Sequence, residues 1–214
     1  MRGRAADPER ARAEAGRRAR GKLRRYAATN RLNRLGTLTY RGSGCHDQRE
    51  VRAHIGAFFR ALRVAKDGKA FPYVWVPEWH TTDHGLHLHF LVGDYVKRSL
   101  ILGSWPHGEI VHIKLIGGLG VGSGKVGEAR KAAGYISKYV AKDFSGAEHL
   151  LGLHRYDLAQ GFQPAATRLT GRSPDDLMAQ ASQMFGSRAV LPVVLGAGAG
   201  LAGRSGDLGA VGLT

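Results

Sequence analysis

Residues 73–92, YVWVPEWHTTDHGLHLHFLV, hold two runs of β-forming residues on either side of a short turn sequence. The second run alternates, with large apolar residues at 86, 88, 90 and 92 and histidines at 87 and 89. Successive strand side chains point to opposite faces, so His87 and His89 share one face, about 7 Å apart, and the apolar set shares the other. We therefore predict a β-hairpin that is anchored in the core by its apolar face and carries two imidazoles on the opposite face.

The bulk composition is that of a basic globular protein. The 214 residues include 32 Lys and Arg against 17 Asp and Glu, and the net charge of +15 favours a polyanionic partner such as nucleic acid. No apolar run approaches the roughly 20 residues that cross a bilayer, and the first residues lack an apolar signal core, so we expect no membrane association and a cytoplasmic location. The only cysteine, Cys45, cannot by itself make a thiolate metal site, so a metal is expected to rest on histidines and carboxylates.

Patterns along the chain predict one main domain with two flanking segments. Residues 1–34 are rich in arginine and are expected to form a helical or disordered basic arm that neutralises phosphates. Residues 35–170 are expected to form an α+β domain, in which an antiparallel β-sheet carries helices on one face and leaves the other face free for binding. Residues 171–214 form a C-terminal extension that we expect to be partly disordered. The expected strands are 35–40, 71–79, 86–92 and about 109–116, and the expected helices are 47–63 and about 126–144.

A third candidate metal ligand lies on the strand that precedes the turn. A hairpin that pairs Trp79 with Leu86 places Glu78 directly across from His87 on the same face, whereas a slip of one residue turns Glu78 away. A cluster of two histidines and a glutamate leaves positions open for water or substrate, as catalytic metal sites do. The alternative is that the histidines are ordinary residues of a half-exposed strand.

The expected helix at 126–144 contains AAGYISKYVAKDF, residues 132–144. At about 100° per residue, one arc of this helix collects Tyr135, Lys138, Tyr139 and Lys142, and the neighbouring stripe is apolar. A phenol with a pKa of about 10 is a poor nucleophile until cations or a metal favour the phenolate, and lysines one turn away supply such positive charge. The alternative is that the tyrosines only pack the helix and the lysines are solvated.

Three motifs, taken together, resemble those of a known protein family: TLTY at 37–40, HLH at 87–89 and YISKY at 135–139. They resemble the ordered motifs of the HUH-endonuclease replication initiators, the rolling-circle Rep proteins of plasmids and phages, over roughly residues 20–165. The two-tyrosine motif is similar to that of microviral phage replication proteins. The arginine-rich N-terminus and HRYDLAQGF at 154–162 look similar to Rep proteins of actinobacterial plasmids and prophages. The fold that this implies is an HUH endonuclease domain of RRM or ferredoxin-like type.

The resemblance implies metal-dependent nicking of single-stranded or hairpin origin DNA through a 5′-phosphotyrosyl intermediate, followed by rejoining. It makes His87, His89 and Glu78 the ligands of Mg²⁺ or Mn²⁺, Tyr135 the first nucleophile with Lys138 beside it, and Tyr139 the second nucleophile. The run GLGVGSGKV at 118–126 departs from the phosphate-loop pattern of helicases, so a host helicase and polymerase are the expected partners. A non-catalytic module that binds single-stranded DNA or RNA, and a relaxase or transposase with the same chemistry, are the alternatives.

Overall fold

The computed structural model describes residues 6–108, 111–116, 124–145, 154, 156–165, 167–185 and 208–213. Within these ranges the chain divides into two compact units, residues 1–163 and 164–214. Most of the glycine-rich run at 118–126 lies outside the described residues, as does most of the C-terminal extension. None of the helices in the described ranges is long and apolar enough to cross a membrane.

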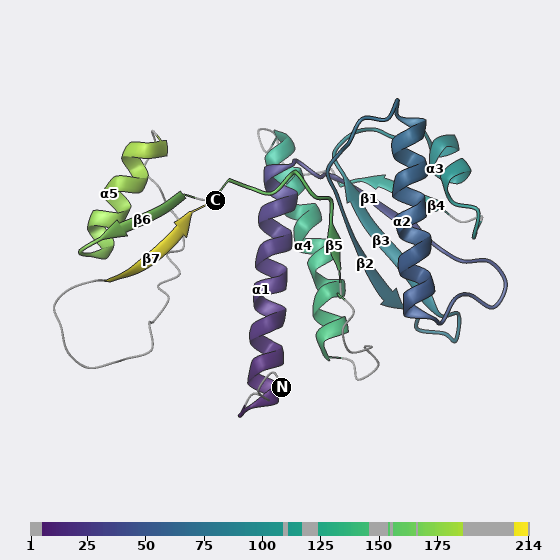
Figure 1. Ribbon diagram of the computed structural model, residues 1–214, viewed down its shortest axis with the longest axis horizontal. Coiled ribbons are helices and arrows are strands. Elements are labelled where there is room, and N and C mark those ends of the chain that lie inside the picture. The colour runs from purple at the N-terminus through teal and green to yellow at the C-terminus, as the bar shows by residue number, and fades with distance from the viewer. Residues whose placement is uncertain are drawn as a thin grey trace. The chain divides into compact units, whose positions relative to one another are not determined.

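The first unit is built on a five-stranded sheet in which every neighbouring pair of strands is antiparallel (Figure 1). The predicted hairpin lies at its centre, because β3 is flanked by β1 and β2. The strand order is β4 (Val111–Leu115), β1 (Arg34–Leu38), β3 (Leu86–Val92), β2 (Tyr73–Trp79) and β5 (Asp157–Leu158). The predicted α+β fold with an antiparallel sheet is therefore confirmed.

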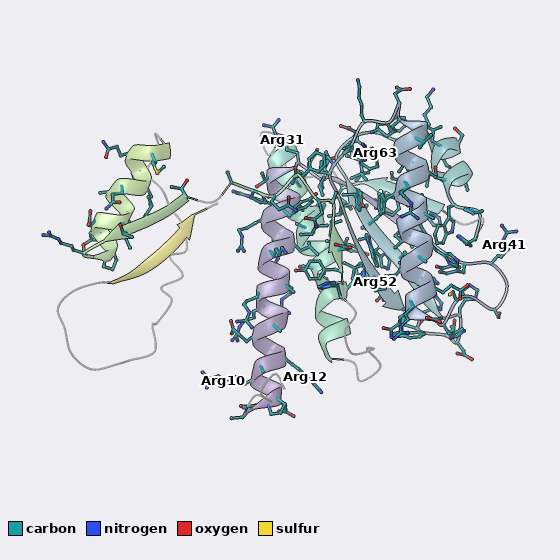
Figure 2. The ribbon with its side chains drawn as sticks, viewed as in Figure 1. Arg10, Arg12, Arg31, Arg41, Arg52 and Arg63 are labelled. Carbon is teal, nitrogen blue, oxygen red and sulfur yellow. The ribbon has the colours of Figure 1, made fainter. Side chains whose placement is uncertain are left out.

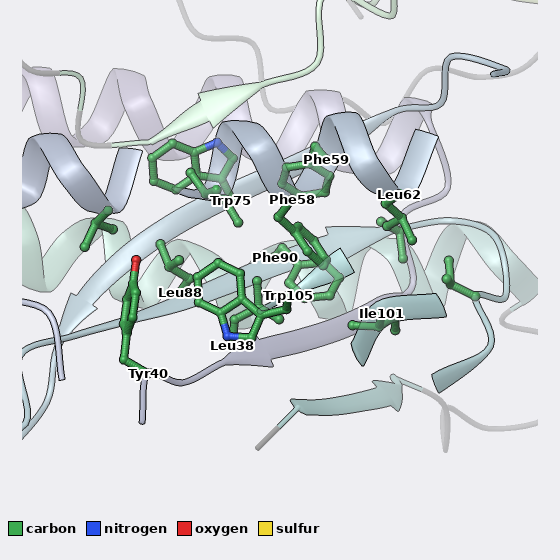
Figure 3. Close-up of a cluster of buried hydrophobic side chains, with 14 of the residues drawn as sticks. Leu38, Tyr40, Phe58, Phe59, Leu62, Trp75, Leu88, Phe90, Ile101 and Trp105 are labelled. Atoms are coloured by element: carbon green, nitrogen blue, oxygen red, sulfur yellow. The ribbon is translucent and has the colours of Figure 1, made fainter. Parts of the chain in front are cut away.

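One face of the sheet is covered by α2 (Gln48–Ala65) and α3 (Arg98–Ser104). Asp47 caps α2 by accepting hydrogen bonds from the backbone N–H groups of Arg49 and Glu50. The apolar residues of β3 contact α2 as their alternation predicts, and they share with it a core rich in aromatic rings (Figure 3). This core includes Leu38, Phe58, Phe59, Leu62, Trp75, Leu86, Leu88, Phe90, Val92, Ile101 and Trp105.

The other face is covered as well, by α1 (Pro8–Thr29) and α4 (Gly124–Ser145) (Figure 1). Val74, Val76 and Leu91 point to this face and form a second core with buried residues of these two helices. The expectation that helices cover one face only is therefore wrong. The physical reason is that β2 and β3 carry apolar residues on both faces near the ends that lie away from the turn, and that surface must also be buried.

The arginine-rich segment is a helix that belongs to the first unit. It begins at Pro8 behind the N-cap Asp7, and it carries its arginines outward, among them Arg10 and Arg12 (Figure 2). Its inner face is made of small or apolar residues, which are Gly16, Ala19, Leu23, Tyr26 and Ala27. Two polar contacts tie its end to the rest of the unit: the Tyr26 hydroxyl donates to Ala159 O at 2.9 Å, and Asn30 Nδ2 donates to Phe162 O at 2.9 Å.

The second unit contains three described elements, β6 (Thr167–Gly171), α5 (Pro174–Phe185) and β7 (Leu208–Leu213). The two strands pair antiparallel, and Leu169 on β6 and Leu177 and Ala181 on α5 are buried. Within the described residues, the extension at 171–214 contains α5 and β7, and β7 pairs with β6, which begins before the extension. Residues 186–207 of the extension lie outside them.

Candidate functional site

The histidine strand and its partner have the predicted register. In the β2–β3 hairpin, Trp79 is opposite Leu86 and Glu78 is opposite His87. The turn closes with a backbone hydrogen bond from His80 N to Gly85 O at 2.9 Å. Gly85 has a φ of 73°, and a Cβ there would lie 2.3 Å from Cys45 O, so only glycine fits. The hairpin therefore holds Glu78 and both histidines on one face, as predicted.

His89 is the most firmly held of the three predicted ligands. Its side chain is almost buried between β2 and β1, and its Nε2 donates to Glu78 Oε2 at 2.8 Å. On the other side, Nδ1 lies 3.1 Å from the hydroxyl of Thr37, which is the residue directly across from His89 on β1. A hydroxyl both donates and accepts, so Thr37 can serve either tautomer of the ring.

His87 has a buried ring nitrogen without a partner. Among the described residues, its Nε2 is the one buried side-chain nitrogen or oxygen that has no hydrogen bond. The ring stacks on His80, with centroids 4.3 Å apart. Burial, and then the neighbouring His80, His89 and His84, lower the pKa of His87 to about 4. His87 is therefore neutral at physiological pH, which is the form of imidazole that binds a metal.

The chemistry of this donor set suits a divalent ion. An unpaired buried nitrogen is costly unless something binds it, and His87 lies directly across from Glu78 on β2 and two residues before His89 on β3. Octahedral Mg²⁺ with bonds of about 2.1 Å places neighbouring ligands about 3 Å apart, close to the 2.8 Å between Glu78 Oε2 and His89 Nε2. In the described residues, however, only Cys45, Glu50 and His54 have three ligand atoms all within 4.8 Å of one another. His87 must therefore reorient to join Glu78 and His89 on one ion.

The tyrosine helix α4 is fixed to the same face by its apolar stripe and by two polar anchors. Arg24 of α1 donates through Nε and Nη2 to Ser137 Oγ at 3.3 and 3.2 Å. The buried Asn33, which precedes β1, donates to Glu128 Oε2 at 2.7 Å. The buried stripe consists of Ala129, Ala132, Ala133 and Ile136, which agrees with the predicted docking side. The side chain of Lys142, which the sequence places on the same arc as the tyrosines, lies outside the described residues.

Tyr139 touches the histidine strand directly. Its ring stacks on His89 with centroids 3.9 Å apart and an interplanar angle of 9°. Burial raises its pKa, and the hydrogen bond with Tyr135, the neighbouring phenol of Tyr135 and the charge of Glu78 raise it further. Tyr139 is thus a protonated phenol placed against a predicted metal ligand.

Tyr135 lies one turn earlier on α4 and is more open. Its side chain is 44% exposed, its ring is 5.7 Å from that of Tyr139, and Lys138 Nζ is 5.7 Å from its ring centroid. The structure therefore brings all six predicted residues onto neighbouring elements, with Tyr139 against His89 and Tyr135 toward solvent beside Lys138.

Some residues that contact this site have no predicted role of their own, among them Thr37 and His80. Thr37 contacts His89, and His80 stacks on His87. Thr37 belongs to the stretch TLTY, so its position in the first motif was the signal that pointed to it. No pattern in the sequence assigns His80, because its contact depends on how the turn folds back on β3.

Comparison with protein-family models identifies a related family. The model described as that of the replication-associated protein ORF2 matches residues 33–144, more than half of the chain, and this range includes β1, the hairpin and nearly all of α4. The searches of curated proteins and of solved structures found no match.

Proposed function

Because the chain belongs to the family of the replication-associated protein ORF2, a membership that supports initiation of rolling-circle replication, we propose that it nicks and rejoins single-stranded origin DNA through a tyrosine. The observation that carries the proposal is the contact between the two predicted halves of the site. The ring of Tyr139 lies flat on His89, and His89 is bonded to Glu78.

In the proposed reaction, a tyrosine Oη attacks the scissile phosphorus. The phenol gives up its proton as the Tyr–O–P bond forms, the bond from phosphorus to the 3′ oxygen breaks, and that oxygen takes up a proton and is released as a 3′-OH, so that the protons balance. Tyr135 is the first-choice nucleophile because its exposed phenol can reach a bound strand and Lys138 stands beside it to stabilise negative charge. Tyr139 is the second nucleophile.

The ligand set of the proposed site is His87, His89 and Glu78, and the ion is Mg²⁺ or Mn²⁺. When bound, such an ion neutralises the developing charge on the phosphate oxygens. The mixed oxygen and nitrogen set and the unpaired His87 Nε2 support this assignment. Thr37 acts through His89 by fixing the orientation of its ring.

The proposed substrate is a single-stranded or hairpin origin. Exposed basic residues on α1 and α4 support binding to a phosphate backbone, and they include Arg10, Arg12, Arg18, Lys22, Arg25, Arg130, Lys131 and Lys138. Strand separation and synthesis are assigned to a host helicase and polymerase, and the protein is expected to act in the cytoplasm.

A denaturing-gel assay tests the proposal. The protein is incubated with Mn²⁺ and labelled single-stranded fragments of its own replicon, and we expect a protein–DNA band that survives denaturation and disappears with a chelator. His87→Ala and Tyr135→Phe should abolish the band, and Lys138→Ala should slow its formation roughly tenfold or more. Tyr95→Phe is the matched control, because Tyr95 is 71% exposed and lies outside the site. Tight DNA binding without any band would instead favour a non-catalytic binding module.

A further inference from the structure

A second cluster of metal-binding side chains lies between the loop after β1 and the first turns of α2. Its members are Cys45, Glu50 and His54, and they line a cavity of about 470 Å³. Tyr40 and His107 line the same cavity. Cys45 and Tyr40 belong to the core beneath α2, whereas His89 contacts α4 on the other side of the sheet. The cluster is therefore separate from the proposed nicking site.

The three ligand groups already lie close together. Cys45 Sγ is 3.5 Å from Glu50 Oε2, and Glu50 Oε1 is 3.8 Å from His54 Nε2. Tetrahedral zinc with bonds of about 2.0–2.3 Å separates its ligands by about 3.3–3.6 Å, so an ion can enter with only small side-chain movements. The imidazole of His107 stacks on His54 with centroids 3.7 Å apart and lines the cavity on the remaining side.

Neighbouring groups hold each ligand in place. The Tyr40 hydroxyl, at the edge of the aromatic core (Figure 3), lies 3.2 Å from His54 Nδ1, which leaves Nε2 to face Glu50. Glu50 and His54 lie one turn apart on α2, whose start is fixed by its cap. The backbone of Cys45 is fixed because its carbonyl accepts a hydrogen bond from Leu86 N at 2.8 Å.

From this geometry we propose that Cys45, Glu50 and His54 bind one Zn²⁺ ion, with the fourth position open to the cavity for water or His107. A thiolate, an imidazole and a carboxylate together select a borderline-soft ion rather than Mg²⁺. Binding releases the thiol proton of Cys45 to solvent and forms the Zn–S bond, with no change in oxidation state. The sequence predicted no thiolate metal site because the chain has one cysteine. The fold brings an imidazole nitrogen and a carboxylate oxygen to that cysteine, and the three together can bind one ion.

The role that we assign to this ion is to hold the loop after β1 against the β2–β3 hairpin, which carries His87 and His89. Two hydrogen bonds already join them: Leu86 N donates to Cys45 O, and His84 Nε2 donates to Tyr40 O at 2.9 Å. Leu86 immediately precedes His87. An ion that fixes Cys45 to α2 therefore restrains the start of β3.

Cobalt substitution tests the site, because Cys45 is the only cysteine in the chain and any thiolate-to-Co²⁺ charge-transfer absorption must come from it. We expect this band to saturate at one Co²⁺ per chain and to vanish on addition of Zn²⁺. Cys45→Ser should abolish it. Glu50→Gln and His54→Gln should each weaken Co²⁺ binding at least tenfold. Circular dichroism checks that Cys45→Ser is folded. Glu50→Gln tests the site without disturbing the core, because the Glu50 side chain is 57% exposed.

Two matched controls separate this proposal from the nicking site. His46→Gln changes another histidine that lines the cavity, and it should leave the band unchanged. The double variant His87→Ala, His89→Ala should also retain the band while losing nicking activity. A wild-type protein without the band, or a band of full affinity in Glu50→Gln and His54→Gln, overturns the zinc site whatever the outcome of the nicking assay.

Discussion

Replacing Thr37 with valine tests how the site orients His89. Thr37 Oγ1 lies 3.1 Å from His89 Nδ1, and the His89 side chain is 9% exposed, so the lost hydroxyl is not replaced by bulk water. Valine has nearly the same shape and suits a strand, so the change removes one hydrogen bond and little else. Leaving a buried donor or acceptor unpaired costs about 1–3 kcal/mol, and losing such a support to a metal ligand lowers metal affinity about 10–100-fold.

The assay measures the rate of protein–DNA adduct formation at a series of Mn²⁺ concentrations. We expect the Mn²⁺ concentration that gives half the maximal rate to rise about 10–100-fold in Thr37→Val, with a smaller change in the rate at saturating Mn²⁺. Thr37→Ser retains the hydroxyl and should behave like the wild type. An unchanged Mn²⁺ dependence in Thr37→Val, with the variant folded, would refute the role assigned to Thr37.

Three further predictions concern the fold that supports the site. Gly36→Ala places a Cβ 2.0 Å from the ring of Phe90, so the free energy of unfolding measured in urea should fall by about 1–3 kcal/mol. An unchanged unfolding midpoint would contradict the described packing. The Tyr26 hydroxyl donates to Ala159 O, so Tyr26→Phe should lose roughly 1 kcal/mol in the same assay, whereas no loss would mean that this bond is absent in solution. Because the pKa of His87 falls from 6.5 to about 4 on folding, the unfolded chain binds the extra proton between these values, and metal-free protein should lose stability as the pH drops through that window. His87→Gln should lose less over the same window, and equal losses in both proteins would argue against the lowered pKa.

The alternation along β3 was enough to predict much of the site from sequence. Side chains two residues apart on a strand share a face regardless of the rest of the fold, so the apolar anchor of β3 and the shared face of His87 and His89 followed from spacing alone. The position of Glu78 depended on the register of the hairpin, because a slip of one residue turns it away; the structure has the register that pairs Glu78 with His87. These are local rules, and the structure follows them.

The second covered face did not follow from local rules. The inner side of α1 consists of glycine, alanine and only two large residues, Leu23 and Tyr26, among many arginines. Such a stripe is weak in a hydropathy pattern, but small residues allow a neighbouring helix to approach closely. The resulting contact between α1 and α4 helps to hold α4, which carries Tyr139, against the sheet.

The cluster around Cys45 also depends on long-range structure. The spacing of Glu50 and His54 predicts that they share a face of α2, but nothing near Cys45 in the sequence predicts that its loop folds against Gly85. Two close backbone approaches create that contact: a Cβ at Gly44 would lie 1.8 Å from His84 O, and one at Gly85 would lie 2.3 Å from Cys45 O. Such fits between distant backbone segments are visible only in the folded chain.

The most direct test of the central claim is to digest the denatured protein–DNA adduct and identify the modified peptide by mass spectrometry. In the wild type we predict a nucleotide joined to Tyr135 through its 5′ phosphate, formed only with Mn²⁺ or Mg²⁺. When the second strand transfer is allowed to proceed, we predict the same modification on Tyr139. An adduct that maps to any residue outside these two tyrosines would contradict the account.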